Sequence, residues 1–136
     1  MERRITILLL LAMQILYSQT KNKSADASFD KMYYIEAAKS YEMSIKSGDL
    51  SKEILQRAGD AHYFNTQMTS ASKWYGKLIA DYPNEVSPEY YFRYSQSLQG
   101  IQNYDLAKKM MKNFSEKQKT SDTRAQNLSL KTITLE

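Results

Sequence analysis

The chain has 136 residues, of which 42% are hydrophobic and 25% charged, the size and composition of one folded domain. With only 4 Gly and 2 Pro it is poor in turn residues, which argues against a sandwich or barrel of many strands and favours helices. The lack of Cys and the single His exclude disulfides, thiol catalysis and sites that need two imidazoles, and a net charge of +4 is too small to indicate a nucleic-acid binder.

Residues 1–18 have the layout of a secretory signal peptide. Two arginines precede an apolar run over Ile5–Leu16, and Ser18 is a small residue at the expected cleavage edge. This run of about 12 residues is shorter than the roughly 20 that a membrane span needs. We therefore expect cleavage near Ser18 and export to the periplasm, with an uncleaved anchoring N-terminus as the alternative.

The rest of the chain repeats with a period of 34 to 36 residues. A small residue is followed four positions later by an aromatic residue or Met at Ala37–Tyr41, Ala71–Tyr75 and Ala107–Met111. Twelve positions before these alanines lie Ala25, Gly59 and Ser95. Small residues that face each other let two helices approach closely, and the large residue one turn on fills the groove toward the next pair. The period therefore predicts three helical hairpins.

Local helix signals agree with this frame. Ser51 and Asn103 are suitable N-caps, the run Ser87-Pro88-Glu89 is a strong helix start, and Gly48 suits a left-handed stop. The expected helices cover residues 20–32, 34–46, 51–65, 68–81, 88–101 and 104–118, and the expected repeats cover 18–51, 52–85 and 88–121. Residues 122–136 are expected to form a C-terminal cap or a frayed tail.

One repeat has a recognisable pattern. In the middle copy, Gly59, Ala71, Tyr75 and Pro83 stand at the spacing W-x2-L-G-x2-Y, A-x3-F and P, and Ala37, Tyr41 and Ala107 occupy the matching positions of the other copies. This pattern resembles the tetratricopeptide repeat (TPR). The resemblance implies an all-α fold, a short right-handed α-solenoid of about three TPR-like hairpins in which these seven residues are structural.

Four stretches carry a narrower resemblance. They are DAHYFN at 60–65, KWY at 73–75, PEYYFRYSQSL at 88–98 and SDTRA at 121–125. Together they resemble the N-terminal TPR module of OmpA-like, peptidoglycan-associated cell-envelope proteins of Bacteroidota, in which propeller-type repeats and an OmpA-like domain follow. The chain ends where that propeller would begin, which leaves two expectations open. One is a free-standing adaptor, and the other is a truncated fragment of an outer-membrane assembly protein whose binding domains are missing.

Enzyme motifs are lacking in the sequence. It contains no G-x-S-x-G, H-E-x-x-H, Walker loop or G-x-G-x-x-G, so we expect no catalysis, metal, cofactor, small-molecule substrate or nucleic acid. His62 stands where the TPR pattern has a packed Tyr and is expected to be buried. The lysines between 108 and 119 are expected to form a solvated convex face, with contact to anionic lipid headgroups, and thus peripheral outer-membrane association, as the alternative.

The repeat frame also predicts a concave groove. The residues expected to face it are Glu53, Gln56, Asp60, Tyr63, Phe64, Phe92 and Gln96. Aromatic side chains exposed on a concave surface are common anchors for a partner, whereas a C-terminal segment that folds back over them is the alternative. We therefore expect a non-enzymatic cell-envelope scaffold or adaptor that binds a protein or peptide through the groove.

Overall fold

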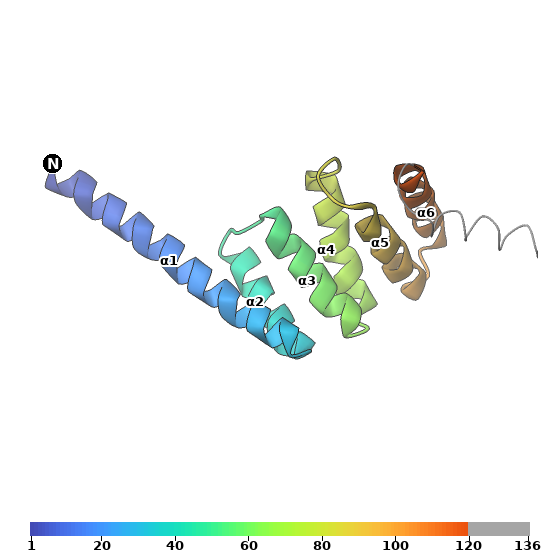
Figure 1. Ribbon diagram of the computed structural model, residues 1–136, viewed down its shortest axis with the longest axis horizontal. Helices are drawn as coiled ribbons and strands as arrows, with labels where there is room; N and C mark the ends of the chain where they lie inside the picture. The colour runs from blue at the N-terminus through green and yellow to red at the C-terminus, as the bar shows by residue number, and fades with distance from the viewer. Residues whose placement is uncertain (120–136) are drawn as a thin grey trace, which may run out of the picture. The chain divides into compact units, whose positions relative to one another are not determined.

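The computed structural model describes residues 1–119, and for residues 15–21 it describes the backbone alone. The described part is all-α, with six helices and no strand (Figure 1). The helices are α1 (Glu2–Asp30), α2 (Tyr34–Lys46), α3 (Lys52–Phe64), α4 (Met68–Asp81), α5 (Pro88–Gly100) and α6 (Tyr104–Gln118). The bounds of α2 to α6 lie within one residue of those expected from the sequence, whereas α1 begins far earlier than the expected residue 20.

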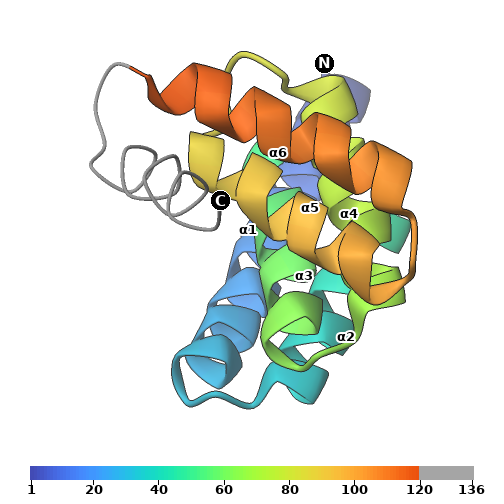
Figure 2. The ribbon, with the colours of Figure 1, turned by 90° about the vertical axis from the view of Figure 1, so that its right-hand side faces the viewer.

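The chain divides into two compact units, residues 1–67 and the part that begins at Met68. In the first unit α2 packs against both α1 and α3, and in the second α5 packs against both α4 and α6. Figure 1 shows the N-terminal part of α1 extending beyond α2, and Figure 2 shows α5 and α6 lying side by side. Each unit is therefore a set of three consecutive helices that pack as neighbours along the chain.

The helix α1 has two parts of different character. Large apolar side chains between Ile5 and Met13 are at least 50% exposed, whereas Ala25 in the C-terminal part is buried where α1 meets α2. No helix among residues 1–119 has both the length and the apolar content that crossing a membrane requires. Cleavage near Ser18 stays a prediction, and the expected cap or tail at 122–136 lies outside the described residues.

One turn geometry closes α1, α3 and α5. The second residue after each helix has a positive φ, 62° at Met32, 60° at Thr66 and 62° at Gln102. The amide of the next residue then donates to a carbonyl five positions back, with N–O distances of 2.8 Å in the first two turns and 2.9 Å in the third. These paired features define a Schellman motif. The three turns recur at steps of 34 and 36 residues, so the local structure follows the period of the sequence.

The small residues of the repeat pattern lie where helices touch. In the second unit the Ser95 hydroxyl on α5 donates to the main-chain carbonyl of Ala107 on α6 at 2.8 Å, and neither residue is more than 2% exposed. In the first unit Ala25 and Ala37 are equally buried. A hydroxyl reaches a carbonyl of another helix only when the two backbones are close, so small side chains are needed at these positions.

The remaining positions of the TPR-like pattern also have structural surroundings. Tyr41 and Tyr75 are fully buried, as is Ala71, and Gly59 is buried on α3. Pro83 is exposed two residues after the end of α4, a place where proline often follows a helix. Its carbonyl accepts a hydrogen bond from the Tyr91 hydroxyl at 3.0 Å, which fixes the loop before α5.

Candidate functional site

Five of the expected groove residues lie on α3 in the first unit, and they differ in exposure. Glu53 is exposed, while Gln56 and Tyr63 are half-buried. Asp60 is only 7% exposed, whereas Phe64 is 43% exposed. Asp60 is therefore almost inaccessible to a partner. The accessible apolar surface on this helix is centred on Phe64.

Phe64 belongs to a cluster of three rings from three helices, with Phe29 near the end of α1 and Tyr34 at the start of α2. We call this set the aromatic cluster. The ring centroids are 5.2 Å apart for Phe29 and Tyr34, 5.6 Å for Tyr34 and Phe64, and 6.1 Å for Phe29 and Phe64. Tyr63 adds an edge-on contact to Phe64 at 5.5 Å. Because each ring rests on two others, the exposed part of Phe64 is held in a fixed position.

Charged groups line one side of the aromatic cluster. The Arg57 guanidinium lies 5.0 Å from the centre of the Phe29 ring, and its Nε is 3.7 Å from a carboxylate oxygen of Asp26. Asp26 also accepts a hydrogen bond from the buried Tyr41 hydroxyl. Burial, followed by this hydrogen bond and the negative charge of Asp26, raises the pKa of Tyr41 well above its usual value. The Tyr41 hydroxyl therefore stays protonated at neutral pH, and its hydrogen bond holds the Asp26 carboxylate beside the aromatic cluster.

Phe92 and Gln96, the other expected groove residues, lie on α5 in the second unit, and both are half-buried. The Phe92 ring is 5.3 Å from the ring of Phe114, a residue of α6 that is 2% exposed. Phe92 therefore contributes to the packing of α5 on α6 and offers only part of its ring to a partner.

His62 is buried, as expected, and joins neighbouring elements of the first unit. Its Nε2 lies 3.0 Å from Glu42 Oε1 on α2, and its Nδ1 lies 2.7 Å from Gln67 Oε1 in the turn after α3. Within residues 1–119, no group of three or more His, Asp or Glu side chains is arranged to hold a metal ion. The contacts of His62 are those of a packing residue that ties α3 to α2.

The sequence interpretation did not include Phe29, Tyr34 or Arg57 in the site. Phe29 precedes Tyr63 by 34 residues, so the repeat spacing contains a signal for it. Tyr34 precedes Ala37 by three positions, as Tyr104 precedes Ala107, so the repeat spacing contains a signal for it too. Arg57 lies on the same helix as the expected residues, and only the distance to Phe29 reveals its role.

The chain matches no protein-family model, and no curated protein matches it.

Proposed function

We propose that this chain is a non-enzymatic scaffold or adaptor of the cell envelope that binds a protein or peptide partner. In this proposal the helices form three TPR-like hairpins in a short right-handed solenoid, and the partner lies along its concave side. Export to the periplasm, through cleavage near Ser18, is part of the same proposal.

The recurring turn supports the repeat architecture. Three helices end in the same left-handed turn at residues that do not favour it, Met32, Thr66 and Gln102. Three independent loops would rarely adopt one strained geometry at steps of 34 and 36 residues. The close contact of Ser95 with Ala107 adds the small-residue packing that TPR-like hairpins need.

The aromatic cluster is the observation that carries the proposed binding role. Phe64 is 43% exposed although it packs against both Phe29 and Tyr34. An exposed ring that is already immobilised loses little side-chain entropy on binding, so more of its contact energy contributes to affinity. Such aromatic anchors often account for about 2 kcal/mol or more each at an interface. The cluster suits an apolar or aromatic side chain of a bound segment.

A capture experiment from envelope extract of the native host tests the binding role. Phe64→Ala, alone and with Phe92→Ala, should lose the main partner found with the unmodified chain. Met43→Ala is the matched control, because Met43 is a large apolar residue of the first unit that is 47% exposed and lies on α2. Circular dichroism must first show that each variant keeps its helical spectrum. Unchanged capture by the Phe64 variants, or equal loss with Met43→Ala, contradicts the proposed site.

Export has its own test. The protein is purified from the native host after cell fractionation and its N-terminus is sequenced. A chain in the periplasmic fraction that begins near Gln19 supports the proposal. A chain in the cytosolic fraction that begins at Met1 contradicts the localisation and leaves the binding test unaffected.

A further inference from the structure

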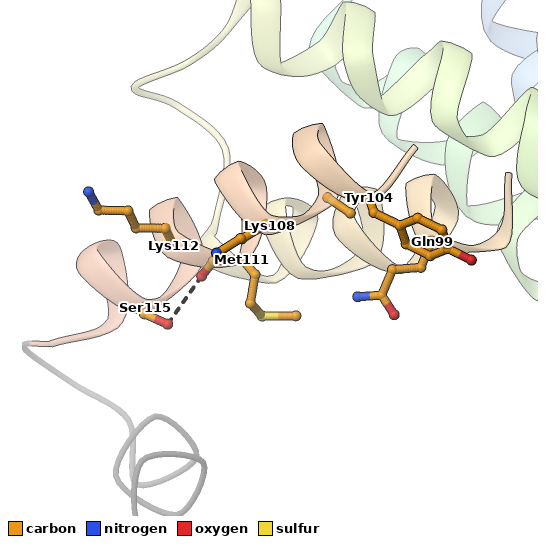
Figure 3. Close-up of a pocket in the computed structure, with 7 residues that line it drawn as sticks. Gln99, Tyr104, Lys108, Met111, Lys112 and Ser115 are labelled. Carbon is orange, nitrogen blue, oxygen red and sulfur yellow. Dashed lines mark hydrogen bonds between the residues drawn. The ribbon is translucent and has the colours of Figure 1, made fainter. Parts of the chain in front are cut away.

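A second surface with a definite chemistry lies on α6. It is a hollow of about 420 Å³ on the second unit, shown in Figure 3. The residues that line it are Gln99 of α5 and Tyr104, Ala107, Lys108, Met111, Lys112 and Ser115 of α6. None of these residues belongs to the aromatic cluster or to the expected groove, so the hollow is a second surface with its own binding properties.

The lining residues follow one stripe of α6. Tyr104, Lys108, Met111 and Ser115 are separated by four, three and four positions, the spacing that keeps side chains on one line of a helix. Figure 3 shows them following the length of α6. At about 1.5 Å per residue the stripe is roughly 16 Å long, or three helical turns. This is the shape on which a second helix packs lengthwise.

The hollow has an apolar floor and a cationic rim. Ala107 is buried, Met111 is half-buried and Tyr104 is 64% exposed. Lys108, which lies between Tyr104 and Met111 on the stripe, and Lys112 are one turn apart and both exposed.

The two lysines are weakly engaged. Lys112 Nζ is 3.8 Å from Glu116 Oε1, a surface pair that contributes little to stability. Within residues 1–119, Lys108 has no ion pair. Two ammonium groups at this spacing match two carboxylates that are also one helical turn apart.

We infer that this stripe binds an amphipathic helix of a partner protein. The apolar side of that helix lies on Met111 and Tyr104, and its acidic residues, one turn apart, face Lys108 and Lys112. Helices recognised in this way present apolar residues at i, i+3, i+4 and i+7, and the charges set the preferred partner.

Charge complementarity distinguishes this occupant from two others. A second copy of the stripe related by a twofold axis would bring Lys108 and Lys112 against their own counterparts, which like-charge repulsion opposes. Residues 120–136, which lie outside the described part, carry Asp122 and Glu136 against Arg124 and Lys131, so their side chains are neutral overall. An acidic helix of another protein fits the rim better than either.

Two synthetic helical peptides test the inference with the full chain. Both carry a leucine stripe, and one has glutamates one turn apart beside it where the other has lysines. Fluorescence anisotropy should show that the glutamate peptide binds about tenfold or more tightly than the lysine peptide. In the variant Lys108→Glu with Lys112→Glu the preference should invert. The matched control reverses Lys39 and Lys46, exposed lysines of α2, and should leave the preference unchanged.

Three outcomes overturn the inference. The first is that the full chain does not bind the glutamate peptide, and the second is a preference that survives reversal of Lys108 and Lys112. The third is binding to phosphatidylglycerol vesicles that depends on the same two lysines without any peptide binding, which would assign the rim to anionic lipid.

Discussion

Overpacking the contact between α5 and α6 gives a quantitative test of the small-residue pattern. Ala107 is 2% exposed, and its carbonyl lies 2.8 Å from the Ser95 hydroxyl. Ala107→Leu adds three carbon atoms beside this close contact, so either the helices must separate or the new side chain must turn away from α5 into a strained rotamer. Such changes cost about 1–3 kcal/mol of the free energy of unfolding.

Ala and Leu have similar helix propensity, so the change in the free energy of unfolding should report the packing of the side chain and not the stability of the helix itself. For a chain of this size about 1 kcal/mol shifts the unfolding midpoint by roughly 3–5 °C, so Ala107→Leu should lower it by about 3–15 °C. The assay is thermal unfolding followed by circular dichroism. Ser95→Ala, which removes the hydroxyl and no other atom, should cost about 1 kcal/mol or less.

Lys109→Leu is the matched control, because it places the same side chain at an exposed position of the same helix. It should change the free energy of unfolding by no more than about 0.5 kcal/mol. If Ala107→Leu and Lys109→Leu have the same midpoint as the unmodified chain, the helices do not meet at Ala107 and the reasoning fails.

The turns, the close helix approaches and the buried tyrosines yield three further predictions. Thr66→Gly should raise the free energy of unfolding by about 1 kcal/mol, because a β-branched residue at φ 60° is strained. The control Lys39→Gly, inside α2, should lower that free energy by a similar amount. If denaturant titration shows the same effect for both variants, Thr66 is not strained. A Cβ at Gly76 would lie 2.9 Å from the Tyr94 hydroxyl oxygen. Gly76→Ala should therefore lower the unfolding midpoint less in a Tyr94→Phe background than in the unmodified chain. If the two substitutions have additive effects on the midpoint, that contact does not form. The pKa of Tyr41 is raised in the fold, so folding favours the protonated hydroxyl. The contribution of Tyr41 to the free energy of unfolding is therefore complete below about pH 10 and is lost as the pH rises further. As the pH is raised above about 10, the free energy of unfolding should fall more steeply for the unmodified chain than for Tyr41→Phe.

The sequence predicted the helices well where caps and periodicity acted together. Pro88 after Ser87 marks the start of α5, and Gly48 has φ 98° as a left-handed stop should. The start of α1 was missed because the signal-peptide layout and the helix were treated as separate segments. No Gly or Pro occurs between Glu2 and Asp30, so no helix-breaking residue separates the apolar run from the rest of α1.

The left-handed turns were beyond local sequence reasoning. Thr66 and Met32 have no intrinsic preference for positive φ, and the geometry arises because the flanking helices require a short connection. The exposure of the candidate site was equally unpredictable. Asp60 and Phe64 lie one turn apart on the same face of α3, yet one is buried and the other is 43% exposed. The rings that hold Phe64, Phe29 and Tyr34, belong to other helices, so the spacing within α3 could not predict that contact.

The central claim is that the hairpin pattern continues through α3 and α4, and an engineered disulfide tests it most directly. Gly59 and Ala71 are the counterparts of Ser95 and Ala107, and the chain has no cysteine to compete. A disulfide needs Cβ atoms about 3.5–4.5 Å apart. In the proposed hairpin the small residues at positions 59 and 71 face each other and bring the two helices close together. The variant Gly59→Cys with Ala71→Cys should then form a disulfide and lose both free thiols under mild oxidation. The reference variant Ser95→Cys with Ala107→Cys should do the same. If the reference pair closes while the first pair keeps its thiols, α3 and α4 do not form such a hairpin, and the proposed groove does not exist.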